Sequence, residues 1–205
     1  MSLPRRMWAG SRIRYHQPLR LGETVHRLST VADVSAKEGK SGSLVFLTLR
    51  HEYEGSNGLA LTEEQDLVYR DNPPPGAPVP APKQAPDNAD WSRRILPDPT
   101  LLFRYSAVTL NAHRIHYDFP YVTETEGYPG LIVHGQLIAT LLLHLAQSNR
   151  PNGEIEEFEF RAMSPLFCNQ PFFVEGVPQA SGREGDLWAR TEAGGLAMKA
   201  DIRWR

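Results

Sequence analysis

The feature that most constrains the fold is residues 134–148, where apolar side chains occupy nearly every side of a predicted helix. The run is shorter than the roughly 18 apolar residues that a membrane span requires. A helix with so little polar face must be covered on most sides rather than rest on a surface. A sheet wrapped around it would suffice. The residues that leave little polar face are Leu137, Ile138, Leu141, Leu142, Leu143 and Leu145.

The sequence around this helix predicts mostly strands. Residues 149–153, Asn-Arg-Pro-Asn-Gly, end the helix, and residues 101–108 ahead of it read as a strand, followed by an irregular segment. We therefore expect a strand, a helix and then four strands in this part of the chain. The four strands are predicted at residues 155–162, 171–178, 187–192 and 196–204.

The N-terminal part alternates polar and apolar residues with period two, which is typical of strands. Gly55-Ser56-Asn57-Gly58 separates two long runs and predicts a β-hairpin. Prolines then dominate residues 72–88, as in a semi-rigid linker. These patterns predict an N-terminal partial repeat at residues 1–71, a linker at 72–90 and a C-terminal catalytic repeat at 91–205. The predicted N-terminal strands are residues 8–15, 24–37, 42–54 and 59–70.

An internal repeat supports this division. Residues 14–19 resemble residues 161–166 in their placement before three further strands, and residues 58–61 parallel residues 195–198. Each half then ends in the same four-strand unit, but only the second half keeps a preceding strand and helix. We therefore expect the first repeat to be incomplete, either because the chain is shortened at its N-terminus or because residues preceding Pro4 are absent from this numbering.

Composition narrows the function classes. The net charge of −2 and pI of about 6.4 give no basic face for nucleic acid. A single cysteine, Cys168, excludes an intramolecular disulfide framework, which favours a reducing compartment. The N-terminus lacks the apolar segment of a signal peptide. We expect a cytoplasmic protein that binds neither nucleic acid nor membrane.

Two segments carry the chemistry. Residues 111–118, Asn-Ala-His-Arg-Ile-His-Tyr-Asp, place a carboxamide, two imidazoles and a carboxylate within eight positions. Residues 130–135, Gly-Leu-Ile-Val-His-Gly, lead into the apolar helix, where backbone N–H groups and the positive end of the helix dipole are free. Together they predict a base and an oxyanion hole. The three histidines match no strong zinc-ligand spacing, so we expect no metal.

These segments, with residues 103–107 and 127–135, resemble the MaoC-like, R-specific enoyl-thioester hydratase superfamily, in its hydroxyacyl-thioester dehydratase type 2 and mesaconyl-C4-CoA hydratase branch. The resemblance implies an α+β double hot-dog fold, in which antiparallel sheets wrap around a central helix. It also implies a catalytic centre in the C-terminal repeat. The substrate would be a coenzyme A or acyl-carrier thioester entering between the repeats, and no separate cofactor is implied.

The chain departs from the general motif of that superfamily at a catalytic position. His116 matches the catalytic histidine, but Asn111 stands where the motif has an aspartate. An amide can position water but cannot accept its proton as a carboxylate does. We therefore expect His116 to take the proton from water as it attacks an enoyl thioester, with Asn111 holding that water. Gly135 is expected to contribute an oxyanion donor.

Further residues are predicted to contact substrate, and other functions stay open. Asp118 is expected to form a turn rather than orient an imidazole. One alternative function is an acyl-CoA thioesterase, and another is a non-catalytic thioester-binding or assembly subunit. Sheet edges left by the incomplete repeat favour a homodimer. The expected substrate-binding residues are His113, Arg114, Tyr117, Val133, His134, Arg104 and Arg161.

Overall fold

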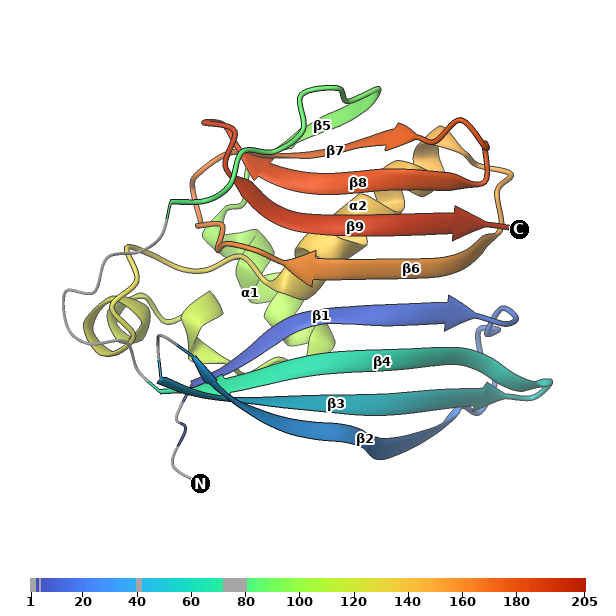
Figure 1. Cartoon of the computed structure of the whole chain (residues 1–205), viewed down its shortest axis with the longest axis horizontal. Helices are drawn as coiled ribbons and strands as arrows, with labels where there is room; N and C mark the ends of the chain where they lie inside the picture. Colours follow the sequence, from blue (N-terminus) through green and yellow to red (C-terminus); the bar gives the residue numbers. More distant parts are fainter. Residues whose placement is uncertain (1–2, 4, 40–41, 72–80) are drawn as a thin grey trace. The chain divides into compact units, whose positions relative to one another are not determined.

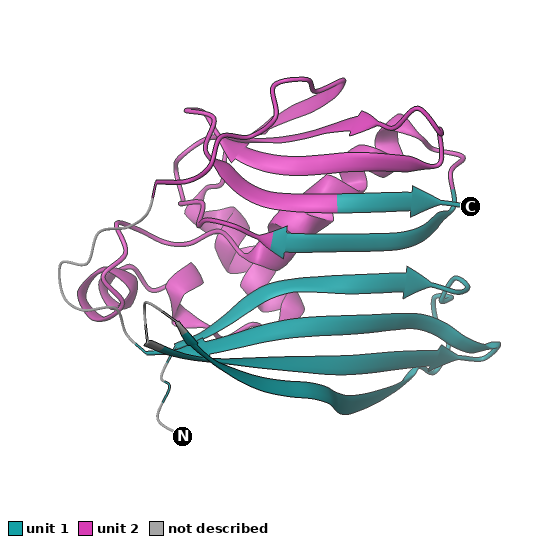
Figure 2. Ribbon diagram, viewed as in Figure 1, with its two compact units in different colours: residues 1–80, 154–161, 201–205 teal, residues 81–153, 162–200 magenta. Residues whose placement is uncertain are grey.

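The computed structural model describes residues 3, 5–39, 42–71 and 81–205, and it divides the chain into two compact units (Figure 2). Each unit combines segments that lie far apart in the sequence, because the chain returns to unit 1 after residue 153 and again after residue 200. The boundaries that the sequence analysis placed at residues 71 and 90 stay a prediction. Unit 1 comprises Met1–Pro80, Glu154–Arg161 and Asp201–Arg205, and unit 2 comprises Ala81–Gly153 and Ala162–Ala200.

All the regular secondary structure in the described part of unit 1 is strand, and loops connect the strands. They lie in the order β2-β3-β4-β1-β6, with antiparallel pairing between neighbours (Figure 1). The expected hairpin is present, since Gly55 pairs with Gly58 across the two residues between them. The four N-terminal strands are thereby confirmed. Their bounds are β1 Arg5–Tyr15, β2 His26–Gly39, β3 Gly42–Gly55 and β4 Gly58–Arg70, and β6 spans Ile155–Ala162 with its last residue in unit 2.

The two faces of the unit 1 sheet carry different contacts, and a bulge in β1 between Trp8 and Gly10 places Trp8 and Arg12 on opposite faces although they are four residues apart. On one face Arg12 bonds to Glu64 and Asp66 across β1 and β4. The opposite face carries Trp8, whose ring lies edge-on against Phe160 at 4.9 Å between centroids. The Arg12 ion pairs and the Trp8–Phe160 contact therefore lie on opposite faces of the sheet.

Unit 2 combines a sheet in the order β9-β8-β7-β5 with the apolar helix α2 (Gly135–Asn149). The helix contacts β5, β7 and β8 (Figure 1). Each fully buried aliphatic or aromatic side chain of this core contributes about 1.5 to 3 kcal/mol. The strands are β5 Trp91–Ile95, β7 Phe172–Pro178, β8 Glu184–Thr191 and β9 Leu196–Trp204, of which residues 201–204 belong to unit 1. The buried residues of α2 are Leu137, Ile138, Ala139, Leu142, Leu145 and Ala146.

The prediction of a strand at residues 101–108 was wrong, because this segment lies in helix α1 (Pro99–Thr109). A short apolar run fits either structure, and the start signal decides here. The Asp98 carboxylate accepts a hydrogen bond from the backbone N–H of Leu101 at 2.7 Å, and Pro99 occupies the first turn. Strand β5 was also missed. The helix at 134–148 and the four strands after it are confirmed within a few residues.

Candidate active site

The end of α1 delivers Asn111 to the site. Leu110 adopts a left-handed conformation with φ of 53°, and the backbone N–H groups of Leu110 and Asn111 donate to the carbonyls of Ala107 and Ser106. This pair of hydrogen bonds is the Schellman motif that closes a helix. The Asn111 side chain then accepts from the His113 backbone N–H at 3.1 Å through Oδ1. Asn111 is thus held on both sides, with its amide NH₂ as a further donor.

His116 lies at the end of a short 3₁₀ turn, η1 (Arg114–His116), and is 7% exposed. Its Nδ1 lies 2.7 Å from the carbonyl oxygen of Ile132, which can only accept a hydrogen bond. The proton of the neutral ring is therefore on Nδ1. Nε2 is left with a lone pair, which is the form that a general base needs.

His134 stacks on His116. The two ring centroids are 3.7 Å apart and the planes differ by 16°. His134 Nε2 hydrogen-bonds to the Ser106 hydroxyl at 2.8 Å, whereas Nδ1 has no hydrogen-bond partner among the described residues. The rings of Tyr105 and His134 meet in a T-shaped arrangement, with their centroids 4.9 Å apart. Helix α1 and the entry to α2 thus meet through this imidazole, which is completely buried.

The surroundings keep both imidazoles neutral. Burial and the nearby His113 together lower the pKa of His116 to about 4, against an opposing contribution from the Ile132 carbonyl. Burial and the neighbouring His116 and His113 lower the pKa of His134 to about 3. At neutral pH the site therefore holds an unprotonated His116, ready to accept a proton.

The start of α2 offers backbone donors beside this pair. The His134 side chain makes no capping hydrogen bond, and the first bond within the helix runs from the Ile138 N–H to the His134 carbonyl. The N–H groups of Gly135, Gln136 and Leu137 precede that bond, so they have no acceptor within the helix. They stand where the helix dipole favours negative charge. This arrangement can stabilise an oxyanion.

The remaining predicted residues divide between structural and exposed positions. The Val133 N–H donates to the Leu166 carbonyl at 2.8 Å, and the Tyr117 hydroxyl donates to the Ala112 carbonyl at 2.8 Å. Arg104 is exposed on α1. Arg161 belongs to unit 1, in strand β6.

Arg114 and Asp118 form a local pair. The Arg114 guanidinium bonds to the Asp118 carboxylate at 2.7 Å and lies 4.2 Å from the centroid of the Tyr121 ring. Asp118 also accepts from the Tyr121 backbone N–H, and this bond together with Arg114 lowers its pKa. The Asp118 carboxylate thus bonds to a guanidinium and a backbone N–H rather than to an imidazole. The guanidinium of Arg114 is already balanced by a carboxylate within four residues.

Sequence reasoning missed Ser106, Tyr105 and the Ile132 carbonyl. Ser106 fell in the segment taken for a strand, where a buried serine carries no signal. As a helix the same segment places Leu102 and Ser106 four residues apart on one buried face. That spacing could have marked Ser106 as facing the interior.

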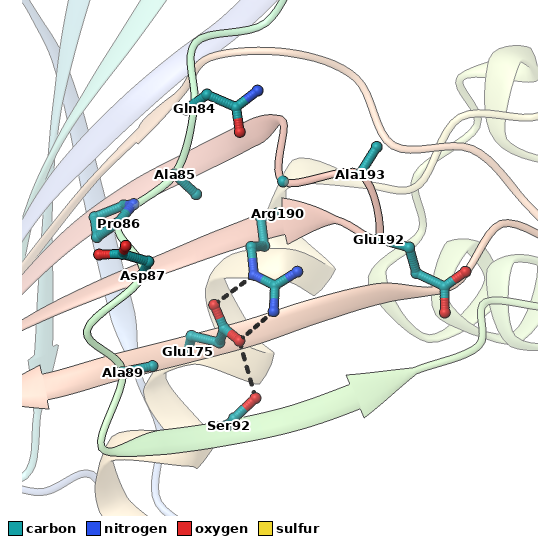
Figure 3. A pocket seen from close by; sticks show the side chains of 11 residues that line it. Gln84, Ala85, Pro86, Asp87, Ala89, Ser92, Glu175, Arg190, Glu192 and Ala193 are labelled. Carbon is teal, nitrogen blue, oxygen red and sulfur yellow. Dashed lines mark hydrogen bonds and ion pairs between the residues drawn. The ribbon is translucent and has the colours of Figure 1, made fainter.

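A separate surface cavity of about 460 Å³ lies beside β7 and β8 and contains none of the predicted catalytic residues. Its one buried charge, Glu175, accepts from Ser92 and Arg190 at 2.7 to 3.0 Å (Figure 3). Glu175 also accepts from the indole N–H of Trp188 at 2.9 Å. These hydrogen bonds outweigh the effect of burial and lower the pKa of Glu175. A carboxylate so fully bonded has a structural role in joining β5, β7 and β8.

Two further classes of feature are absent from the described ranges. They contain no group of three metal-ligating side chains placed to hold an ion. Within the same ranges, no helix has both the length and the hydropathy to cross a bilayer.

Comparison with known sequences gives a consistent family. A model described as hydroxyacyl-thioester dehydratase type 2 matches residues 1–168. The chain is 46% identical to mesaconyl-C(4)-CoA hydratase of Chloroflexus aurantiacus over 204 residues, which are 97% of this chain and 70% of that protein. It is 30% identical to the mitochondrial hydroxyacyl-thioester dehydratase type 2 of Schizosaccharomyces pombe over 210 residues, covering 91% of this chain and 68% of that protein.

Solved structures resemble the chain in fold. A MaoC-like dehydratase from Phytophthora capsici superimposes with a TM-score of 0.77 at 17% identity, covering 98% of this chain and 72% of that one. A Mycobacterium tuberculosis protein described as having a double hotdog fold gives a TM-score of 0.66 at 16% identity, covering 97% and 74%. These likenesses confirm the expected double hot-dog class.

Proposed function

Because this chain belongs to the hydroxyacyl-thioester dehydratase type 2 family, we propose that it reversibly hydrates an enoyl thioester to a 3-hydroxyacyl thioester. The reaction adds the oxygen of water to the β-carbon and a proton to the α-carbon. The reverse reaction removes the same water. The direction depends on the concentrations of the metabolites.

The observation that carries the proposal is the state of His116. Its Nδ1–H is committed to the Ile132 carbonyl, so Nε2 is the free base, and burial keeps the ring neutral. In the proposed step, Nε2 accepts a proton from the water as its oxygen bonds to the β-carbon. The resulting imidazolium is the acid that returns a proton to the α-carbon.

Asn111 and the start of α2 serve the other reacting groups. The Asn111 amide orients the attacking water, since its Oδ1 already holds the His113 backbone and its NH₂ remains a donor. The thioester oxygen gains negative charge as the β-carbon is attacked. The N–H of Gly135 stabilises that charge at the positive end of the α2 dipole.

We propose an acyl-CoA of the mesaconyl-C4 type as the substrate, because the relative at 46% identity carries the name mesaconyl-C(4)-CoA hydratase. Such a substrate brings a carboxylate as well as the thioester. The other proposed binding residues remain His113, Arg114, Tyr117, Val133, Arg104 and Arg161, whereas His134 is completely buried and bonded to Ser106. Arg104 is the better candidate for the carboxylate than Arg114, whose charge Asp118 already balances.

The test follows loss of the enoyl-thioester absorbance with mesaconyl-C4-CoA and crotonyl-CoA. We expect turnover by the wild type without release of free thiol, and a loss of about 10² to 10⁴-fold in His116→Ala, since a general base is removed. His144→Ala is the matched control, because His144 is exposed on α2. More than a tenth of the wild-type rate in His116→Ala would reject the role of His116. Thiol release would instead indicate a thioesterase.

We also propose that the protein is a cytoplasmic homodimer. Strand β2 is at the edge of the unit 1 sheet, and Leu28, Val31 and Val34 on it are 60%, 63% and 62% exposed. An exposed edge strand with apolar side chains favours pairing with a second chain. Sedimentation equilibrium tests this proposal, and a monomer at micromolar concentration would reject it.

A further inference from the structure

A buried imidazole next to the proposed base has no direct part in the reaction described above. His134 is completely buried, and its ring covers one face of His116 at 3.7 Å between centroids. It is also anchored, because Nε2 bonds to Ser106 at 2.8 Å inside the protein. A histidine that merely filled space would need neither the parallel stack nor a buried hydroxyl partner.

We infer that His134, anchored by Ser106, is a positioning residue that fixes the ring plane of His116 and so directs Nε2 toward the substrate. This inference rests on the proposed function, in which Nε2 is the base. A hydrogen bond from Nδ1 to the Ile132 carbonyl fixes one atom of the ring but leaves rotation about that bond. The stacked His134 ring removes that freedom by occupying the space on one face.

The anchor explains why His134 can act as a fixed surface. The rings of Tyr105 and His134 also form a T-shaped contact. Helix α1 therefore holds His134 through the Ser106 hydrogen bond and through the Tyr105 ring. Ser106 precedes the end of α1 by one turn, and its carbonyl also binds the Asn111 N–H. One residue of α1 therefore sets the position of both the water-orienting amide and the stacked imidazole.

The stack also has an electrostatic consequence. Two imidazolium rings at this separation repel each other strongly in a buried site, so protonation of one disfavours protonation of the other. The titratable groups that face the pair are His113, with its ring centroid 5.7 Å from that of His116, and Tyr105. Removing His134 takes away the ring that covers one face of His116, which lessens the burial of that imidazole and frees it to turn.

The experiment combines kinetics with a titration that needs no substrate. The imidazole resonances of His116 are followed by NMR against pH in the wild type and in His134→Ala, His134→Phe and Ser106→Ala. The same four proteins are assayed for kcat and KM with mesaconyl-C4-CoA. His134→Phe keeps an aromatic ring in the stack without the Ser106 bond, and Ser106→Ala is the smallest change, which keeps a folded variant available.

We expect His134→Ala to raise the pKa of His116 toward its ordinary value and to lower kcat about 10- to 100-fold, as loss of an orienting partner does. KM should change less than about threefold, because substrate contacts remain. His134→Phe should restore most of the kcat. The kcat of Ser106→Ala should lie between those of the wild type and His134→Ala.

Two results would overturn the inference. One is a titration of His116 that is the same in His134→Ala as in the wild type, whatever happens to kcat. The other is a His134→Phe variant as slow as His134→Ala. If the wild type turns over no enoyl thioester, the proposed function fails, but the titration still decides whether His134 controls the His116 ring.

Discussion

Lowering the pH from about 8 to about 5 should destabilise this protein through its two stacked histidines. The folded state keeps both rings neutral, with pKa values of about 4 for His116 and about 3 for His134, whereas the unfolded chain has the ordinary value of about 6.5. The unfolded state therefore binds more protons below about pH 6.5, and stability falls as pH falls. Over this range each histidine lowers the free energy of unfolding by about 2 kcal/mol, so the pair lowers it by about 4 kcal/mol.

The assay is urea unfolding followed by circular dichroism at the two pH values. His134→Phe retains the aromatic ring but removes one titrating group, so its loss of stability should be smaller than that of the wild type by about 2 kcal/mol. His144→Phe alters an exposed ring and should leave the difference unchanged. Equal losses in wild type and His134→Phe would refute the conclusion that the buried imidazole is neutral.

Two further predictions concern stability. Asp98→Ala removes the N-cap of α1 and should cost about 1 kcal/mol in urea unfolding, while Asp98→Asn, which keeps an acceptor, should cost less; equal effects would show that the cap is unimportant. Glu175→Gln removes the charge that Arg190 pairs with and should cost about 2 to 3 kcal/mol, measured in the same way. A loss below about 0.5 kcal/mol would mean that the buried pair contributes little.

The periodicity of apolar residues was enough to predict the N-terminal strands, but it was not enough to predict helix α1. Period-two alternation located β1 to β4, and the apolar run located α2, because each pattern extends over eight or more residues. The segment 101–108 is a short apolar run with no period long enough to separate helix from strand. Its helix was signalled only by Asp98 and Pro99, the capping pair at its start.

In the site, too, the residues of a local motif could be predicted, whereas contacts between distant segments could not. The sequence motif predicted a base at His116, and the structure places the rings of His113 and His134 against it in the unit that also holds Asn111. The tautomer could not be predicted, since it depends on a carbonyl 16 residues away. The stack of His134 on His116 likewise requires two chain segments to meet, which no local pattern encodes.

The orientation of His116 by a main-chain carbonyl has a genetic consequence. Every amino acid type supplies that carbonyl, so no amino-acid substitution at position 132 deletes the acceptor itself. A substitution at residue 132 therefore keeps the acceptor that sets the tautomer of His116. At Ser106, by contrast, the bond to His134 depends on a hydroxyl that few other residues provide.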